Sequence, residues 1–197
     1  MRDVSRETLA RLQIYADLLA KWTQKINLIS AGSVPDLWTR HIEDSAQIFS
    51  LASPGWQTWL DMGSGGGLPG LVIAILAAEN PGRDVVMVES DARKCAFLRT
   101  ALRETGVPGR VVHGRIEALD PWGADVISAR ALAALPDLLG YTEKHLVPGG
   151  QALFPKGQTA QRELDEALDR WSFACQKHRS KTDAHGVILS IGDVKRA

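Results

Sequence analysis

Cysteine is scarce in this chain, with two residues among 197. Cys95 and Cys175 lie far apart, and neither belongs to a CxxC pair or to a spacing typical of zinc ligands. This excludes a disulfide framework and predicts no metal site, and it favours reduced thiols in the cytoplasm. We expect Cys95 to pack inward from a helix.

Long hydrophobic runs are also missing. The longest apolar stretch, residues 68–78, is about half as long as a membrane-spanning helix, and it contains Pro69 and Gly70. The N-terminus carries Asp3 and Glu7 and lacks the apolar segment of a secretory signal. We therefore expect a cytoplasmic protein with no membrane partner.

The chain has no excess of either charge, since 23 basic residues balance 23 acidic ones. Bulk charge therefore gives no support to a nucleic-acid partner, and any basic surface for one must be local. With 45% hydrophobic and 23% charged residues, the composition is that of a globular protein and excludes a disordered or fibrous one. The length fits one domain with a small extension.

Glycine, by contrast, is concentrated in one stretch, Asp61–Gly70, which reads DMGSGGGLPG. It follows a short apolar run typical of a strand and precedes an apolar run typical of a helix, so the glycines fall at a strand-to-helix turn. Glycine there can take positive φ and lets the backbone approach a ligand. The N-terminus of the following helix offers free N–H groups to an anionic group. The stretch therefore predicts a ligand-binding turn.

Around this turn, the hydrophobic periodicity predicts alternating strands and helices. Amphipathic helices are expected at 5–22 and again from Pro35, with Ser33 as a cap. The expected strands are 58–62, 84–89, 110–114, 124–128, 151–155, 171–176 and 187–191. Further helices are expected at 69–79, 92–105, around 138–139 and at 160–168, with a turn at 148–150. This order predicts an α/β fold with a mostly parallel, seven-stranded sheet covered on both faces. We divide the chain into a helical extension, 1–53, and a main domain, 54–197.

The ligand of the turn is open on the glycines alone. Gly65, Gly67 and Gly70 match G-x-G-x-x-G, and Glu89 follows at a spacing suited to a ribose contact, so a nicotinamide-dependent oxidoreductase is one interpretation. The order acid-x-G-x-G-x-G, beginning at Asp61, instead resembles motif I of class I S-adenosylmethionine-dependent methyltransferases. That resemblance implies a Rossmann-like fold in which Glu89 holds the ribose hydroxyls of the cofactor.

Several other stretches, in order along nearly the whole chain, resemble one family, the 16S rRNA guanine-N7 methyltransferases called RsmG or GidB. They are Asn27–Ser30, Arg40–Ser45, Asp61–Gly70, Glu89–Asp91 with Lys94, Phe97 and Leu98, Ser128–Ala131 and Phe154–Gly157. The resemblance implies methyl transfer from S-adenosylmethionine to N7 of a guanine in 16S rRNA, expected to be guanine 527. It also implies the cofactor contacts Asp61, Gly63, Gly65, Leu68, Glu89, Ile116, Glu117 and Arg130.

Some of these cofactor residues have simpler interpretations. Leu68 and Ile116 fit a hydrophobic core, and Glu117 fits a solvated surface. Arg130 is harder to explain without a partner, because an arginine directly after an apolar strand is costly to bury unpaired. Its partner is the cofactor carboxylate, a neighbouring acid or RNA.

The absence of an evident catalytic base agrees with this chemistry. Guanine N7 already carries an in-plane lone pair, so it needs no deprotonation, and orientation and proximity supply the rate. We therefore expect no catalytic side chain, and His113 is expected to be structural. Neither cysteine has the setting of a cytosine-C5 nucleophile, and Ser128–Ala131 is not the Asn/Asp-Pro-Pro-aromatic motif of adenine-N6 enzymes.

RNA contacts are expected near the cofactor from Lys25, Asn27, Arg40, His41 and Lys156, because the family motifs place them on the N-terminal helices and after the fifth strand. The simpler alternatives are a solvated Lys25 and an exposed ion pair of Asp44 with Arg40 or His41. The expected partner is 16S rRNA or the small ribosomal subunit, with no DNA, and the chain is expected to be a monomer. Alternatives are a methyltransferase for another RNA or a small molecule, the oxidoreductase above, and a non-catalytic RNA-binding module.

Overall fold

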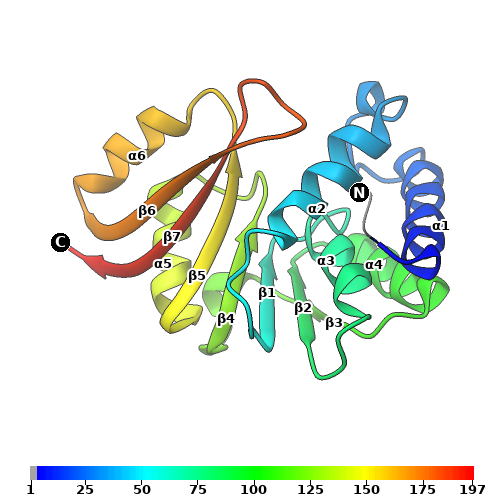
Figure 1. Ribbon diagram of the computed structural model, residues 1–197, viewed down its shortest axis with the longest axis horizontal. Coiled ribbons are helices and arrows are strands. Elements are labelled where there is room, and N and C mark those ends of the chain that lie inside the picture. The colour runs from blue at the N-terminus through cyan, green and yellow to red at the C-terminus, as the bar shows by residue number, and fades with distance from the viewer. Residues whose placement is uncertain (1–3) are drawn as a thin grey trace.

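Seven strands form one sheet in the computed structural model, which describes residues 4–197 (Figure 1). They are β1 (Thr58–Met62), β2 (Asp84–Glu89), β3 (Arg110–His113), β4 (Ala124–Ala129), β5 (Leu146–Lys156), β6 (Trp171–Arg179) and β7 (Val187–Arg196). Their order is β3-β2-β1-β4-β5-β7-β6. Neighbours among β1 to β5 are parallel, whereas β7 runs antiparallel to both β5 and β6. The predicted mostly parallel, seven-stranded sheet is confirmed.

Helices cover both faces of this sheet, as predicted. The helical elements are α1 (Arg6–Thr23), η1 (Ala31–Ser33), η2 (Trp38–Glu43), α2 (Asp44–Phe49), α3 (Gly70–Ala77), α4 (Ala92–Thr105), η3 (Ile116–Ala118), α5 (Leu135–His145) and α6 (Ala160–Leu168). One hydrophobic core joins α1, α2, α3 and α4 to one face, and a second joins α5 and α6 to the other. Alternating residues of the buried strands supply both cores: Trp59 faces the first and Leu60 the second.

The expected helical extension shares a core with the main domain. Leu12, Tyr15 and Leu19 of α1 are fully buried together with α3 and α4, whereas Leu9, which belongs to the same apolar pattern, stays exposed. The division at residue 53 therefore stays a prediction about domains and does not mark a gap in packing.

The second helix differs from its prediction. Pro35 lies in a turn, and the helix proper begins as the π-helical η2 before it continues as α2. Ser33 caps neither element: it ends the 3₁₀ turn η1, and its hydroxyl donates to the carbonyl of Ser30 at 2.8 Å. The predicted cap was wrong because the Ser33 side chain is used in a contact between elements, described below.

The predicted turn at 148–150 is instead part of a strand. The Pro148–Gly150 segment lies inside β5, where Gly149 takes φ +77° and the pairing with β4 shifts register. The bulge absorbs the glycines without ending the strand. The strand predicted at 171–176 continues to Arg179 as β6, and β7 begins at Val187, so the hairpin turns at 180–186. Among residues 4–197, no helix combines the length and the apolar character that crossing a bilayer requires.

Candidate functional site

The glycine turn after β1 adopts a backbone that favours glycine at alternate positions. Gly63, Gly65 and Gly67 have φ of +65°, +55° and +84°. A Cβ at Gly67 would lie 2.7 Å from the Cβ of Leu71, so this position combines positive φ with close packing. The predicted ligand-binding turn therefore has the conformation that its sequence indicated.

Glu89, the last residue of β2, holds this turn against the neighbouring strand. Its Oε2 accepts the N–H of Gly65 at 2.8 Å, and its Oε1 accepts the N–H of Asp91 at 2.8 Å. The Ser64 N–H donates to the carbonyl of Val88 at 3.0 Å. The carboxylate is 7% exposed, so it lies at the floor of the site with both oxygens fixed.

Asp61 lies beneath the turn, fully buried. Its Oδ2 accepts the N–H of Gly70 at 3.1 Å, the first residue of α3, and its Oδ1 accepts the hydroxyl of Ser128 at 2.7 Å. Trp59 donates its indole N–H to the same hydroxyl at 2.8 Å. Burial raises the pKa of Asp61 to about 6, although the hydrogen bonds act in the opposite direction. Asp61 thus ties β1 to β4 and to the start of α3, and it lines neither of the two cavities described next.

Two cavities lie side by side at the carboxyl ends of β1, β2 and β4, and we call them the glycine-turn cavities. Their volumes are about 320 and 210 Å³. Both are lined by Gly63, Glu89, Ser90 and Leu132. The larger one adds, among others, Gly65, Leu68, Lys94 and Arg130; the smaller adds, among others, Ile116, Glu117, Ala133 and Tyr141. Apart from Asp61, every residue expected to contact the cofactor lines one of them.

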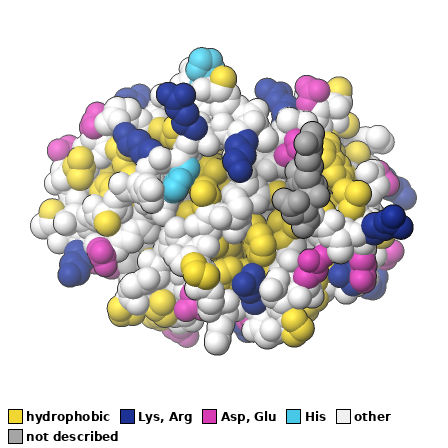
Figure 2. Space-filling view, viewed as in Figure 1, with side chains coloured by type: hydrophobic (Ala, Val, Ile, Leu, Met, Phe, Trp, Pro, Cys, Tyr) yellow, Lys and Arg dark blue, Asp and Glu magenta, His cyan; other side chains and the backbone are white. Residues whose placement is uncertain are grey.

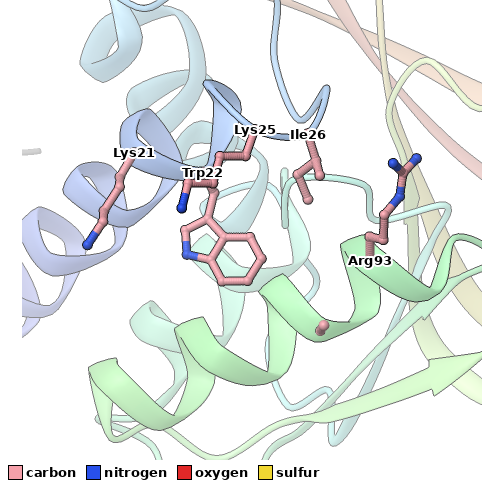
Figure 3. A pocket seen from close by; sticks show the side chains of 6 residues that line it. Lys21, Trp22, Lys25, Ile26 and Arg93 are labelled. Atoms are coloured by element: carbon pink, nitrogen blue, oxygen red, sulfur yellow. The ribbon is translucent and has the colours of Figure 1, made fainter.

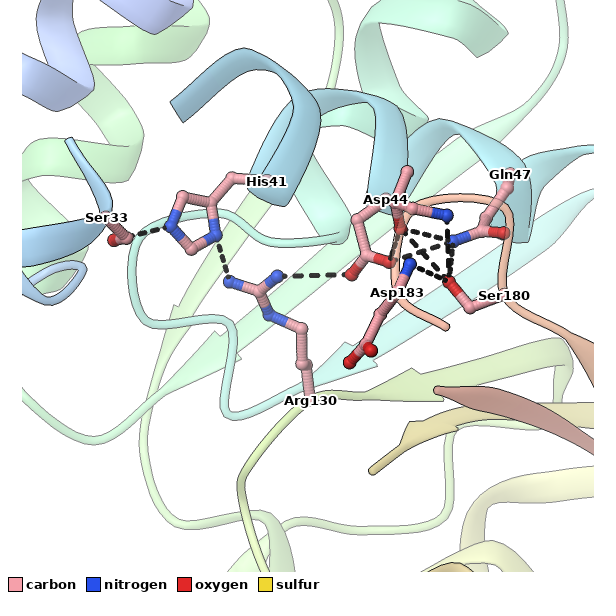
Figure 4. A network of polar contacts seen from close by, with 8 residues as sticks. Ser33, His41, Asp44, Gln47, Arg130, Ser180 and Asp183 are labelled. Carbon is pink, nitrogen blue, oxygen red and sulfur yellow. Dashed lines mark hydrogen bonds and ion pairs between the residues drawn. The ribbon is translucent and has the colours of Figure 1, made fainter. Parts of the chain in front are cut away.

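Arg130 connects the larger cavity to the N-terminal helices (Figure 4). Its Nη2 lies 2.9 Å from Nδ1 of His41, and its Nη1 lies 3.4 Å from Oδ2 of Asp44. A guanidinium can only donate, so Nδ1 accepts, and the ring proton on Nε2 points to the Ser33 hydroxyl 2.8 Å away. Burial and then the charge of Arg130 lower the pKa of His41 to about 4. The imidazole is therefore neutral in the folded chain at pH 7.

Asp44 also reaches the loop between β6 and β7. Its Oδ1 accepts the hydroxyl of Thr182 at 2.6 Å and the Nε2 of Gln47 at 2.8 Å. The alternative of an exposed pair between Asp44 and Arg40 or His41 is therefore wrong, because Arg130 supplies the cation and the site is half-buried. No pattern in the last 25 residues indicated the contact from Thr182.

A second contact missed by sequence reasoning comes from α1. The hydroxyl of Tyr15 donates to the carbonyl of Gly66 at 2.6 Å, although the apolar pattern indicated only a core residue. Burial raises the pKa of Tyr15, which keeps this hydroxyl protonated. The N-terminal helix thus supports the glycine turn directly.

The residues expected to contact RNA divide into two groups. Lys25, Asn27 and Arg40 are exposed. His41 is taken up by Arg130, and Lys156 is largely buried: its Nζ donates to Glu163 at 2.7 Å and to the carbonyl of Ala133 at 3.2 Å. Lys156 therefore holds the loop after β4, which forms one wall of the cavities.

Basic side chains gather on the upper part of the face in Figure 2, on the side where the loop between β6 and β7 projects in Figure 1. The exposed residues of this hairpin include Lys177, Arg179 and Lys181. The chain as a whole is neutral, so this local excess of positive charge matches the expectation of a local basic surface.

His113 bonds the carbonyl of Ser90 at 3.0 Å, and Cys95 is fully buried as expected.

In the strand order, β7 lies antiparallel beside β5. This order and the glycine turn together define a class I methyltransferase. A family model described as rRNA small subunit methyltransferase G (GidB) matches residues 8–190. The chain belongs to this family, and the predicted resemblance is confirmed.

Relatives and solved structures agree. The chain is 53% identical to the ribosomal RNA small subunit methyltransferase G of Ruegeria sp. (strain TM1040), over 98% of this chain and 95% of the relative. The protein of the same name from Ruegeria pomeroyi shows the same identity and coverage. A crystal structure of an O-methyltransferase from Bacillus cereus in complex with SAH matches with a TM-score of 0.61 at 14% identity, covering 96% of this chain and 92% of the other. This last likeness shows the fold alone.

Proposed function

We propose that this chain transfers a methyl group from S-adenosylmethionine to N7 of a guanine in 16S rRNA. Family membership supports the reaction. The observation that carries the proposal is the placement of Glu89, a nearly buried carboxylate that lines both glycine-turn cavities where they meet. A ribose between an adenine and a methionine chain needs a hydrogen-bond acceptor at that position.

The lining of the two cavities fits the chemistry of this cofactor. The larger cavity has the cations Lys94 and Arg130 within reach of a carboxylate, and the smaller has Ile116 and Tyr141 as apolar walls suited to an adenine ring. Gly63 lies between them, where a Cβ would come within 2.6 Å of Leu132. We therefore assign the methionine end to the larger cavity and the adenine end to the smaller, with Glu117 at its rim.

The proposed reaction needs little from side chains beyond placement. When bound, S-adenosylmethionine supplies an electrophilic methyl group on a sulfonium. The lone pair of guanine N7 would take this methyl group as the S–C bond pair returned to sulfur, so no proton would need to move. Glu89 and the glycine turn orient one reactant, and the loop after β4, held by Lys156, forms the wall nearest to the incoming base. Orientation of this kind accounts for at most about 7–11 kcal/mol of barrier lowering.

On the RNA side, we propose that the exposed Lys25, Asn27 and Arg40 contact the substrate. His41 and Lys156, whose polar atoms bond within the chain, are proposed to act through Arg130 and the loop after β4. The N7 edge faces the deep groove of an A-form duplex, so the target guanine is expected to be presented from a loop or a distorted helix. Guanine 527 is the expected nucleotide.

We further propose that the chain acts as a monomer in the cytoplasm, on 16S rRNA or the small subunit, with neither DNA nor a membrane as partner. Size measurements by light scattering check the oligomeric state. Binding of double-stranded DNA as tight as that of the rRNA substrate would contradict the partner assignment.

The direct test is methylation of small subunits that lack the modification. Purified protein is incubated with such subunits and methyl-labelled S-adenosylmethionine, and the label is mapped to a nucleoside and to a position. We expect N7-methylguanosine in 16S rRNA from the wild type and a large loss with Glu89→Gln. Label on another base or on a small molecule, or binding of NADH in place of S-adenosylhomocysteine, would overturn the proposal.

A further inference from the structure

A third cavity, of about 450 Å³, lies between the end of α1 and the beginning of α4 (Figure 3). It is lined by Lys21, Trp22, Lys25, Ile26, Arg93 and Ala96. It shares no lining residue with the glycine-turn cavities. Half of its lining residues are cations, and none is acidic.

Trp22 forms a fixed aromatic surface in this cavity. Its ring packs against Phe97 of α4, with centroids 5.5 Å apart and planes tilted by 58°. The indole is only partly buried, and Figure 3 shows it between Lys21 of α1 and Arg93. An aromatic ring held from one side and open on the other is suited to stacking with a nucleobase.

The three cations lie around this ring, and among residues 4–197 neither Lys21 nor Lys25 forms an ion pair. Lys21 lies in the last turn of α1 and Lys25 in the turn that follows it, and both side chains line the cavity. Arg93 contacts the carboxylate of Asp91 at 3.4 Å, and its side chain is 75% exposed. Like charges gathered in this way repel one another, and phosphate groups would offset that cost. A base flanked by phosphates therefore matches the cavity better than an apolar or acidic peptide does.

The position relative to the proposed active site favours RNA over a free nucleotide. Arg93 lines this cavity and Lys94 the larger glycine-turn cavity; likewise Ile26 lines the first and Leu28 the second. The exposed Asn27 lies between the latter pair. Neighbouring residues of the same two segments thus line both cavities, so one RNA strand that leaves the target guanine can contact the third cavity as well.

We propose that this cavity binds a single-stranded nucleotide of the rRNA next to the methylated guanine. Its base stacks on Trp22, and its phosphates contact Lys21, Lys25 and Arg93. This inference rests on the proposed function, because the occupant is part of the same substrate. Stacking accepts any base, so the cavity adds affinity and register without reading sequence.

The test compares variants in the methylation assay on small subunits. Trp22→Leu keeps an apolar contact with Phe97 but removes the stacking face, and the double variant Lys21→Gln/Lys25→Gln changes only exposed side chains. Arg93→Gln is matched by Arg103→Gln, because both arginines are exposed on α4 and contact an adjacent acid. We expect the KM for subunits to rise about ten-fold for Trp22→Leu. For the double variant, the negative slope of log affinity against log salt should become shallower by about 1.4. The kcat and the affinity for S-adenosylhomocysteine stay within about two-fold of wild type, as expected for a site remote from the reacting atoms.

The outcomes separate this inference from the proposed function. If wild-type protein methylates guanine N7 but the KM of each variant matches that of Arg103→Gln, the third cavity has no role and the inference is overturned. If wild-type protein does not methylate rRNA, the proposed function itself fails. Should Trp22→Leu not fold, the double variant decides by its KM and salt slope alone.

Discussion

Arg130 and His41 share a hydrogen bond of 2.9 Å that exists only while the imidazole is neutral. The pKa of His41 is lowered to about 4 from 6.5, first by burial and then by Arg130. The bond links the strand that ends at the proposed active site to the N-terminal helices, and Asp44 extends it to the β6–β7 loop. Three segments distant in sequence are thus joined through Arg130 and Asp44.

This bond predicts a pH dependence of stability. A histidine with a lowered pKa contributes stability that is complete above pH 6.5 and is lost as pH falls toward 4, because the unfolded chain binds the extra proton. In His41→Asn, the amide oxygen can still accept from Arg130 but does not titrate. We expect wild-type protein to lose more unfolding free energy than the variant between pH 6.5 and 4, as measured by denaturant titration.

The titration of Asp61 also changes stability with pH, but it does so equally in the two proteins compared. Its raised pKa of about 6 acts in the opposite direction, since the folded chain holds the proton more tightly. The contribution is present in both proteins, so the difference between the two curves reports His41. Parallel curves over this range would contradict the assigned tautomer.

Asp61 itself predicts a contrast between two substitutions. Asp61→Ala removes the acceptor of Gly70 N–H and of the Ser128 hydroxyl, leaving buried polar groups unpaired, and should lower the free energy of unfolding by about 2–4 kcal/mol. In Asp61→Asn the amide can accept from Gly70 and donate to Ser128, so the loss should be less than half as large. Equal losses in chemical denaturation would show that the charge, and not the pairing, matters.

Alanine substitutions at Gly67 and Gly82 distinguish the cost of a positive φ from the cost of steric crowding. Both have positive φ, +84° and +92°, but a Cβ at Gly67 meets Leu71 at 2.7 Å whereas one at Gly82 meets nothing within 4 Å. Gly82→Ala should cost about 1–2 kcal/mol from φ alone. Gly67→Ala should cost more and also weaken binding of S-adenosylhomocysteine, as measured by calorimetry. A Gly67→Ala protein as stable as Gly82→Ala would contradict the packing described for the turn.

Local sequence features predicted those parts of the fold that short-range physics determines. The glycine turn and the strands around it follow from positive-φ glycines and apolar runs, and the predicted sheet and its helices on both faces are confirmed. The errors lie where long-range pairing overrides local signals. Pro148–Gly150 looks like a turn, but pairing with β4 carries the strand through it as a bulge.

The residues of the site likewise fall into those that local sequence features predict and those that they do not. Residues at the ends of strands, such as Glu89 and Arg130, were predictable because parallel strands end at one edge of a sheet. Tyr15 and Thr182 were not, because each reaches the site across long stretches of sequence and has no distinctive motif. Their roles depend on tertiary contacts that no local pattern encodes.

Glu89 predicts the affinity for the cofactor. Glu89→Gln removes the charge, and its amide can accept from only one of the N–H groups of Gly65 and Asp91. We expect calorimetry to show binding of S-adenosylhomocysteine weakened about 10- to 100-fold. Glu117→Gln, at an exposed position of the smaller cavity, should change it far less. Equal effects of the two substitutions would remove Glu89 from its assigned place beside the ribose.

Two roles of Lys156 can be distinguished by experiment: a contact with RNA, and support of the loop after β4. Its Nζ is fixed between Glu163 and the carbonyl of Ala133, and Glu163 also accepts the N–H of Leu135 at 3.0 Å. Although burial alone would raise the pKa of Glu163, the bonds from Lys156 and Thr159 lower it. Both partners of the pair are thus committed to the loop and to the start of α5.

Lys156→Ala leaves Glu163 largely buried without its cation and should cost about 2–4 kcal/mol in unfolding free energy. Adding Glu163→Gln to it should recover part of that loss, since the unpaired charge is then gone. If Lys156 only positions the loop, the salt dependence of rRNA binding keeps its wild-type slope in both variants, whereas a phosphate contact would reduce the slope by about 0.7–0.9. The same titration on Arg40→Ala, an exposed position, gives the slope change expected of a direct contact.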